Sequence, residues 1–460
     1  MARPFRTITL WVVVLVAFAG AVGSVVWRFL PHLLDRERDN SGELDTLKNA
    51  PLATAPPAAE TGWPQWFGPH RDGRAPDGPL RADWDQTPPT KLWGVPCGGG
   101  YSSFAAVGGR LFAQDYTGGN ERLLCLDAAS GKTVWVHESP ADYAGFRQGY
   151  GTGPRATPTV HDGRVYAVGA TGSFVCVENA DAGPTPKVLW KHDLAAEFRA
   201  PVPTWGFASS PLIEGDLVLV QPGGKGGSVA AFDRKTGDLR WTAGTDPVGY
   251  SSPVAATIAG VRQVVAVTGA SVLGIRPADG QILWKRDWRT QHGGNIATPL
   301  VVGEYVFVSS NYQKGCALFR IAAKGDGATA EEVYFRKNRV MMNHHATSVH
   351  RCGFLFGFTN ASLTCVNLRT GETVEDWEAT RLDKGNVILA GDKLLGVTER
   401  GTLFLVDADP KEFRLRGKVD NVLTGGGDCW ALPVLLDGRI YLRDATQILC
   451  YDVRPVEGKK

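Results

Sequence analysis

Tyr250-Ser251-Ser252-Pro253, followed by the apolar run Val254-Ala255-Ala256, opens the unit whose repetition decides the fold. Each unit holds two small residues, usually a proline, a glycine turn and two apolar strands. The opening recurs at Tyr101-Ser102-Ser103-Phe104, Arg155-Ala156-Thr157-Pro158, Ala208-Ser209-Ser210-Pro211, Ile296-Ala297-Thr298-Pro299, His345-Ala346-Thr347-Ser348, Gly385-Asn386-Val387 and Trp430-Ala431-Leu432-Pro433. From Phe104 to Pro433 the chain takes seven steps, so the mean period is about 47 residues. A fixed period of this length is typical of propellers and solenoids.

Within each unit the apolar runs alternate with turns of Gly and Asp, as in Gly163-Arg164-Val165-Tyr166-Ala167-Val168. This alternation predicts four-stranded antiparallel meanders arranged around an axis, the blades of a β-propeller. Several units also contain an Asp-x-x-Thr-Gly turn with a tryptophan four residues after the glycine, as Trp241 follows Gly237. We expect these rings to lie on outer strands and to pack against the next blade.

The number of openings predicts eight blades, or seven if the degraded unit at Gly385 is an insertion. The last unit ends at Asp452 without an outermost strand, whereas Lys91-Leu92-Trp93-Gly94-Val95 forms an outer strand without inner partners. Pairing these two segments would close the ring and satisfy both free edges. The fold class is therefore predicted as all-β, an eight-bladed β-propeller of four-stranded antiparallel blades over residues 63–460.

The N-terminal region precedes the repeats and has a different character. Arg3 and Arg6 come before an uncharged run from Ile8 to Trp27, which is long enough to cross a membrane as a helix. We therefore expect a cytoplasmic tip and transmembrane anchor over residues 1–30 and an Ala/Pro-rich linker over residues 31–62. A cleaved signal peptide is the alternative, because Ala17-Phe18-Ala19 resembles a cleavage site.

Charge and cysteine usage exclude some classes of function. The chain has 49 Lys and Arg against 47 Asp and Glu, and no basic run with interleaved aromatic residues, so a nucleic-acid partner is not expected. Most of the eight cysteines occupy one position in a strand, as Cys125 and Cys176 do, which indicates core thiols. Cys97 and Cys429 enter neighbouring inner strands across the ring seam, where they either pair or stay free. The cysteine and histidine spacing matches neither a zinc site nor a c-type haem site.

One phrase, Ala-x-Asp-x-x-Thr-Gly-x-x-x-Trp, is matched in full from Ala231 to Trp241 and nearly in full from Cys125 to Trp135. In this phrase and its repetition the chain resembles the pyrroloquinoline-quinone (PQQ)-like β-propeller repeat family. The resemblance implies the propeller fold over roughly Trp63 to Arg454. The family includes quinoprotein dehydrogenases, which hold the quinone and a calcium ion in the axial funnel, and non-catalytic BamB-like members of the outer-membrane assembly machinery. The chain lacks the adjacent Cys-Cys pair of many of those dehydrogenases and the lipobox cysteine of BamB.

The opening Trp63-Pro64-Gln65-Trp66-Phe67-Gly68 resembles the start of membrane-associated bacterial members of the same family. With the predicted anchor, this resemblance implies a single-pass protein of the bacterial inner membrane with its body in the periplasm. Acidic residues after the run, such as Asp35 and Glu37, are consistent with that orientation. Secretion after signal cleavage is the alternative location.

Candidate site residues enter the first strand of the blades, because all first strands of a propeller begin at the same mouth of its axial channel. We expect a concave pocket with aromatic walls and convergent polar groups at this mouth. Its predicted ligand-binding residues are Tyr101, Arg155, Trp205, Tyr250, Asn295, His344, His345, Lys384, Asp428 and Trp430, with Tyr150 and Phe207 beside them.

Structural roles compete with each of these predictions. Tyr101, Tyr250 and Trp430 would then pack between strands, and Arg155 would anchor the loop of residues 144–153 through carbonyl groups. Adjacent strand residues point to opposite faces, so only one of His344 and His345 is expected to face the axis, and no metal site is predicted.

The sequence favours a non-catalytic, membrane-tethered periplasmic propeller that binds a protein, peptide or small ligand at its axial mouth. One alternative is a PQQ-dependent dehydrogenase, in which four residues orient the quinone, namely Arg155, Asn295, Lys384 and Asp428, with calcium as a second cofactor. Asp428 would act there as the catalytic base, and Trp205 or Trp430 would stack on the quinone. The other alternative is an outer-membrane assembly scaffold.

Overall fold

The computed structural model describes residues 61–146, 151–179, 185–337, 339–379, 382–425 and 427–456. The predicted anchor and almost all of the predicted linker lie outside these residues. No helix within the described part of the chain is long and apolar enough to span a membrane.

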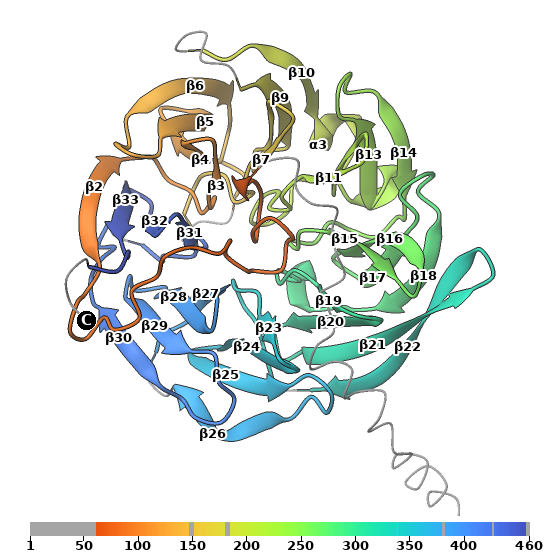
Figure 1. The fold of residues 1–460 in the computed structure, drawn as a ribbon. Coiled ribbons are helices and arrows are strands. Elements are labelled where there is room, and N and C mark those ends of the chain that lie inside the picture. Colours follow the sequence, from red (N-terminus) through yellow and green to blue (C-terminus); the bar gives the residue numbers. More distant parts are fainter. Residues whose placement is uncertain are drawn as a thin grey trace, which may run out of the picture. The chain divides into compact units, whose positions relative to one another are not determined.

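Eight antiparallel sheets, numbered here as blades 1 to 8, follow one another around an axis (Figure 1). Blade 1 comprises β1 (Gly62–Trp63), β3 (Ala105–Val107), β4 (Arg110–Thr117), β5 (Asn120–Asp127) and β6 (Thr133–Pro140). Blade 2 comprises β7 (Thr159–His161), β8 (Arg164–Val168), β9 (Ser173–Glu178) and β10 (Val188–Asp193), and the short helix α3 (Leu194–Glu197) follows it. Blade 3 comprises β11 (Leu212–Glu214), β12 (Leu217–Val220), β13 (Val229–Asp233) and β14 (Leu239–Ala243), with the 3-10 turn η3 (Gly224–Gly226) inside it. Blade 4 comprises β15 (Val254–Ile258), β16 (Val261–Val267), β17 (Ser271–Ile275) and β18 (Ile282–Asp287), and the turn η4 (Gln291–Gly293) follows it.

The second half of the ring repeats this order. Blade 5 comprises β19 (Leu300–Val302), β20 (Tyr305–Ser310), β21 (Gly315–Lys324) and β22 (Gly327–Arg336). Blade 6 comprises β23 (Val349–Arg351), β24 (Phe354–Thr359), β25 (Ser362–Asn367) and β26 (Thr373–Ala379). Blade 7 comprises β27 (Gly385–Ala390), β28 (Lys393–Thr398), β29 (Leu403–Asp407) and β30 (Leu415–Val419), so the degraded unit at Gly385 is a true blade. Blade 8 comprises β31 (Val434–Leu436), β32 (Arg439–Arg443), β33 (Gln447–Asp452) and β2 (Thr90–Pro96).

The ring closes as predicted, through an early strand that completes the last blade. Strand β2 pairs antiparallel with β33, and Trp93 lies opposite Cys450. In Figure 1 the orange β2 flanks the blue β33. The predicted eight-bladed all-β propeller of four-stranded blades is therefore confirmed.

The strands differ in burial according to their distance from the axis. The third strand of blade 4, β17, is buried at every position, because neighbouring blades cover both of its faces. The outer strand β18 buries only Trp284 fully and exposes most other positions. Five of the cysteines, at positions 125, 176, 316, 365 and 450, are fully buried core thiols as predicted. Cys97 and Cys429 are free thiols in this structure.

Aromatic rings on several outer strands pack against the turn of the next blade. The Trp190 indole packs on Gly237, donates to the Arg234 carbonyl at 3.3 Å, and lies where a Cβ on Gly237 would meet it at 2.8 Å. Gly237 has a φ of +82°, which glycine adopts without steric strain. Trp93 on Gly131 and Trp241 on Gly280 repeat the arrangement, which confirms the predicted packing between blades.

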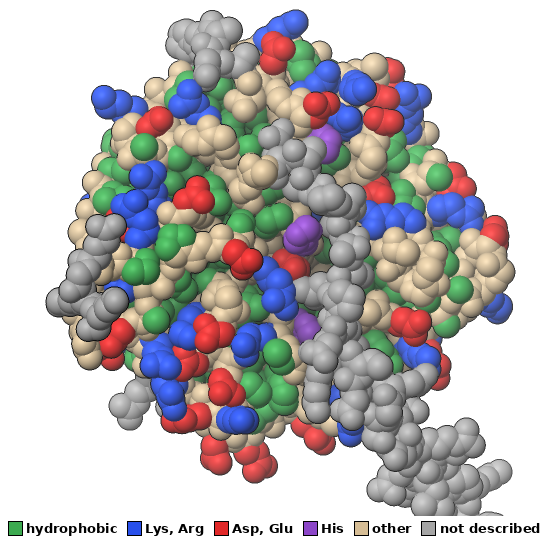
Figure 2. All heavy atoms as spheres, viewed as in Figure 1, with side chains coloured by type: hydrophobic (Ala, Val, Ile, Leu, Met, Phe, Trp, Pro, Cys, Tyr) green, Lys and Arg blue, Asp and Glu red, His purple; other side chains and the backbone are tan. Residues whose placement is uncertain are grey.

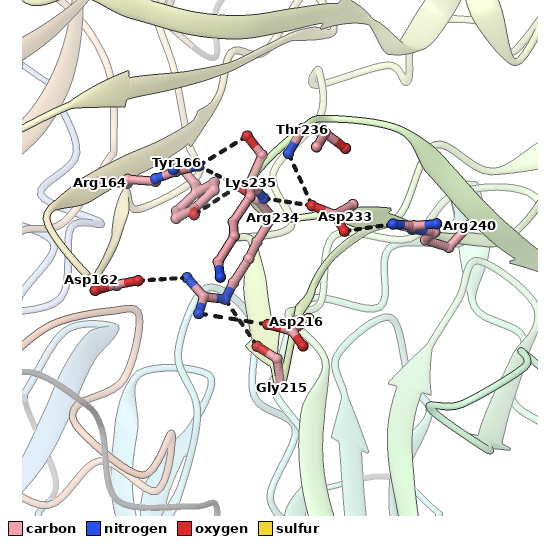
Figure 3. Close-up of polar contacts among 10 residues, drawn as sticks. All are labelled: Asp162, Arg164, Tyr166, Gly215, Asp216, Asp233, Arg234, Lys235, Thr236 and Arg240. Carbon is pink, nitrogen blue, oxygen red and sulfur yellow. Dashed lines mark hydrogen bonds and ion pairs between the residues drawn. The ribbon is translucent and has the colours of Figure 1, made fainter.

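Polar contacts reinforce the same junction between blades 2 and 3 (Figure 3). The Tyr166 hydroxyl donates to the Arg234 carbonyl at 3.0 Å, and Arg164 donates to the Lys235 carbonyl at 3.0 Å. The Arg234 guanidinium reaches back to the Asp162 carboxylate at 3.0 Å. The turn of blade 3 is thus bonded through its main chain and its side chain to blade 2.

A segment outside the repeats crosses the middle of the ring, where it is coloured red to orange in Figure 1. This axial segment (residues 62–75) contacts the inner strand, or the residues just before it, in all eight blades. Its partners, from blade 1 to blade 8, are Ala106, Val160, Pro211, Pro253, Thr298, His350, Leu389 and Leu436. Arg71 is its most buried charged residue, with 2% of its surface exposed, and burial lowers its pKa to about 9.

Candidate functional site

An axial cavity of about 580 Å³ opens where the blades begin. Every blade contributes to its lining, and the axial segment adds Trp66. Nine of the ten predicted ligand-binding residues line it, namely Tyr101, Arg155, Trp205, Tyr250, His344, His345, Lys384, Asp428 and Trp430. The common starting point of the first strands explains why residues so far apart in sequence converge here.

Asn295 is the exception, and its predicted place in the site is wrong. Its amide nitrogen donates to the Thr268 carbonyl at 2.8 Å and to the Trp288 carbonyl at 2.9 Å. Its amide oxygen accepts from Ser310 Oγ at 3.0 Å, so this fully buried side chain organises the strands behind the cavity. Phe207 is likewise buried in the core between blades, and Tyr150 lies outside the described residues.

One wall of the cavity is a continuous aromatic surface. The Tyr101 and Trp430 ring centroids lie 4.7 Å apart, Trp430 and His345 3.9 Å apart, and His345 and His344 3.8 Å apart. On the other side Trp205 packs 5.4 Å from Tyr250. Tyr101, Tyr250 and Trp430 thus pack against other rings and also line the cavity.

The two histidines do not alternate as strand residues would. Both lie in a bend before β23, stack on each other and line the cavity, so the inference that only one faces the axis is wrong. Burial lowers the pKa of His344 to about 4 and lowers the pKa of His345 further below its ordinary value, with Lys384 acting in the same direction. Their buried Nδ1 atoms have no hydrogen-bond partner in the described residues. At neutral pH both rings are uncharged.

Four ionic side chains share the cavity. Arg155 donates to the carbonyls of Gly151 and Gly153, the latter in a short contact, and its guanidinium lies 5.5 Å from the Tyr101 ring centroid. The predicted anchoring of the preceding loop by Arg155 is thus present. Lys384, Glu399 and Asp428 complete the set.

Asp428 is exposed at the rim, whereas Glu399 Oε2 accepts from the Trp430 indole at 3.3 Å. Acidic and basic side chains are interspersed over the face seen in Figure 2, without a large area of one sign.

The axial segment forms the floor of the cavity. Trp66 lines it together with Ser210 and Ser252, and the Trp66 indole donates to Thr298 Oγ1 at 2.8 Å. The other contacts of the segment lie at the last residues of two blade openings, where Arg71 donates to the Pro211 and Pro253 carbonyls, or within the inner strands. The floor therefore closes the axis below the cavity and leaves the blade-opening end as its mouth.

The sequence interpretation missed Trp66, Glu399 and Tyr312. Glu399 and Tyr312 lie in the turns between second and third strands, which a meander places at the same end as the start of its first strand. This topological rule would have identified them. Trp66 has no counterpart in the repeat, so no such rule points to it.

Comparisons with known proteins agree with this architecture. The profile of the family described as "Outer membrane protein assembly factor BamB" matches residues 14–183 and 119–375. No curated protein sequence matches the chain.

Among solved structures, BamB from Moraxella catarrhalis is similar with a TM-score of 0.56 and 15% identity, over 79% of this chain and 99% of that chain. The quinohemoprotein alcohol dehydrogenase ADHIIG from Pseudomonas putida HK5 has a TM-score of 0.56 and 12% identity, over 92% of this chain and 84% of that chain. The computationally designed Ika8 protein has a TM-score of 0.53 and 12% identity, over 79% of this chain and 99% of that chain.

At these identities the structural likeness shows the fold alone, and it includes a BamB, an alcohol dehydrogenase and a designed protein on one architecture. The family profile covers more than half of the sequence. The chain therefore belongs to the PQQ-like β-propeller family whose profile is described as outer membrane protein assembly factor BamB.

Proposed function

We propose that this protein is a non-catalytic binding propeller, tethered to the bacterial inner membrane, that takes a ligand into its axial cavity in the periplasm. The observation that carries the proposal is the cavity itself, which has one mouth, a tryptophan floor and aromatic walls. Its volume of about 580 Å³ is in the range of pockets that enclose small molecules. The tether is the uncharged run from Ile8 to Trp27.

The residues at the cavity do not fit the cofactor pair of a quinoprotein dehydrogenase. Protein calcium sites use six to eight oxygen ligands, chiefly carboxylates and carbonyls, whereas the side chains at the cavity offer two carboxylates, Glu399 and Asp428, and one amide, Gln291. In the described ranges no cluster of three or more His, Cys, Asp or Glu side chains could hold a metal ion. Asn295, the amide assigned to the quinone, is committed to other partners. We therefore derive no redox step for this chain.

The proposal is tested on protein purified from its native host. Native mass spectrometry should reveal a bound small molecule, and its density should lie at the axial mouth. Exchanging Trp430→Ala should remove the bound molecule, whereas Trp241→Phe, on the outer strand β14, should retain it. Protein that carries no ligand from its host and binds none from a host extract would contradict the proposal.

A second assay addresses the dehydrogenase alternative. PQQ and calcium are added to the purified protein, and dye-linked alcohol oxidation is followed. We expect neither quinone absorbance on the protein nor turnover. Turnover by the unmodified protein that is lost in Asp428→Asn would overturn our proposal and favour the dehydrogenase.

Protein-partner binding is the other candidate, and the description of the matching family favours it. Under this alternative the chain is a scaffold in outer-membrane protein assembly. Its partner proteins then bind the loops rather than the axial cavity. Affinity purification from solubilised membranes distinguishes the two. Recovery of barrel-assembly components, undiminished in Trp430→Ala, would support the scaffold.

A further inference from the structure

The lining of the axial cavity is divided into two halves of different chemistry. All four ionic groups lie in one part of the ring, called here the ionic half: Lys384 and Glu399 from blade 7, Asp428 from blade 8 and Arg155 from blade 2. The Tyr101 and Trp430 rings lie between them. Blades 3 to 6 and the turns between them contribute the aromatic rings of Trp205, Tyr250, Tyr312, His344 and His345, with the His292 ring beside Trp205. Burial lowers the pKa of His344 and His345, so these two rings are neutral. A ligand that fills the cavity must therefore present ionic groups on one side and an apolar, planar body on the other.

The ionic half carries two basic and two acidic side chains, so their formal charges sum to zero. Arg155 is bonded only to carbonyl groups, and no ion pair joins Arg155, Lys384 or Asp428 to another described residue. Glu399 accepts one hydrogen bond, from the neutral Trp430 indole. Two cations and two anions are thus available to a ligand.

The energetics of desolvation select among ligand classes. An uncharged ligand such as a sugar would take the half-buried Arg155, Lys384 and Glu399 from water without returning opposite charges, which is unfavourable. A polyanion would meet the two carboxylates, and a polycation would meet Arg155 and Lys384. A zwitterion supplies one partner of each sign, and its charge-assisted hydrogen bonds are stronger than those of neutral groups.

Resting on the proposed function, we propose that the ligand of the axial cavity is a zwitterion with an aromatic body, namely an aromatic amino acid or a short peptide with both termini free. Its carboxylate binds Arg155 or Lys384, and its ammonium group binds Asp428 or Glu399. Its ring packs against Trp205 and Tyr250, where aromatic pairs add stabilisation beyond the area that they bury.

Isothermal titration calorimetry on the full chain in lipid nanodiscs tests the proposal with four probes. These are the dipeptide Phe-Phe, its N-acetyl form without the ammonium group, its C-terminal amide without the carboxylate, and Ala-Ala without rings. We expect Phe-Phe to bind and each of the other three to bind at least about tenfold more weakly, which corresponds to about 1.4 kcal/mol. Equal affinity of either capped form, or no binding of Phe-Phe, overturns the proposal.

Two variants locate the ammonium group. Asp428→Asn should weaken Phe-Phe about tenfold but leave the N-acetyl form unchanged. The matched control is Asp383→Asn, because this carboxylate is paired with Arg400 at 3.1 Å and does not line the cavity. Equal losses in both variants contradict the assignment, and thermal unfolding of each confirms that it is folded.

The same samples separate this inference from the proposed function. A sugar or an anion found by mass spectrometry in protein from its native host would overturn the zwitterion proposal and leave the binding propeller intact. Absence of any ligand would contradict both the zwitterion proposal and the proposed function.

Discussion

At the scale of single residues, the turn glycines decide how closely two blades approach. Gly237 combines a φ of +82° with a Trp190 ring 2.8 Å from where its Cβ would stand, whereas Gly215, in the same blade, has a φ of +59° and open space. Gly237→Ala should lower the free energy of unfolding by about 3 kcal/mol, from backbone strain and overpacking together. Gly215→Ala should lower it by about 1 kcal/mol, from backbone strain alone. Urea unfolding of both variants measures the difference, and equal losses would show that the ring contact contributes nothing.

A buried histidine should make stability depend on pH. His350 is 3% exposed, its Nε2 accepts from the Gly353 amide at 3.1 Å, and burial beside Arg74 lowers its pKa to about 4. The unfolded chain, with an ordinary pKa near 6.5, takes up a proton first as the pH falls. Stability is therefore lost between about pH 6.5 and pH 4, by about 3 kcal/mol for this residue. His350→Gln should flatten the curve of unfolding free energy against pH in that window. An unchanged slope would refute the assignment.

The sequence predicted which side chains line the cavity where a residue's position before a first strand determines the direction of its side chain. The prediction failed where local hydrogen bonds turn the side chain elsewhere. Tyr101, Trp205 and Asp428 reach the cavity because they precede first strands. Asn295 occupies an equivalent position, but the buried carbonyls of Thr268 and Trp288 need donors, and its amide turns away to supply them. Sequence position alone does not reveal such a demand.

At the scale of elements, the small residues that open the blades form hydrogen bonds between neighbouring blades. Ser210 Oγ accepts from the Thr157 amide at 2.9 Å, and Ser252 Oγ accepts from the Ser210 amide at 3.0 Å. Thr347 Oγ1 accepts from Thr298 in the same way. The hydroxyl of one blade thus satisfies the backbone of the preceding blade, which gives the repeated Ser and Thr a structural reason.

The axial segment should stabilise the whole ring. The buried Arg71 guanidinium donates to the Pro253 carbonyl at 2.9 Å, to the Pro211 carbonyl and to Gln65 Oε1 at 2.8 Å. Arg71→Met leaves these buried acceptors unpaired and should lower the free energy of unfolding by about 3 kcal/mol or more. The matched control is Arg74→Met, whose side chain is 38% exposed and should cost under about 1 kcal/mol. Chemical unfolding compares them. Similar stabilities would show that Arg71 is dispensable.

No feature of the sequence indicates this role of the axial segment. Its residues have no counterpart in the repeat, and many of their partners are backbone carbonyls, which every residue type provides. The resemblance of the Trp63-Pro64-Gln65 opening to other proteins indicated the family of the chain. It did not indicate where in the fold this segment lies.

At the scale of the whole molecule, the repeat determined most of the fold. Period, blade number and closure by Trp93 beside Cys450 all follow from the requirement that each blade covers its neighbour and that no edge stays unpaired. The ligand does not follow from these rules, because the same closed ring serves proteins with different activities. Only the side chains at the cavity distinguish them.

The predicted N-terminal tether also belongs to this scale, and it lies outside the described residues. The run from Ile8 to Trp27 exceeds the usual apolar core of a signal peptide, so we expect it to remain as a transmembrane helix. Full-length protein should stay with membranes after alkaline carbonate extraction. Protease should digest the body in spheroplasts but not in intact cells, because positive charge before the run and acidic residues after it favour a periplasmic body. A soluble periplasmic form whose N-terminus lies just beyond Ala19 would instead establish a cleaved signal, and the binding propeller would then act untethered.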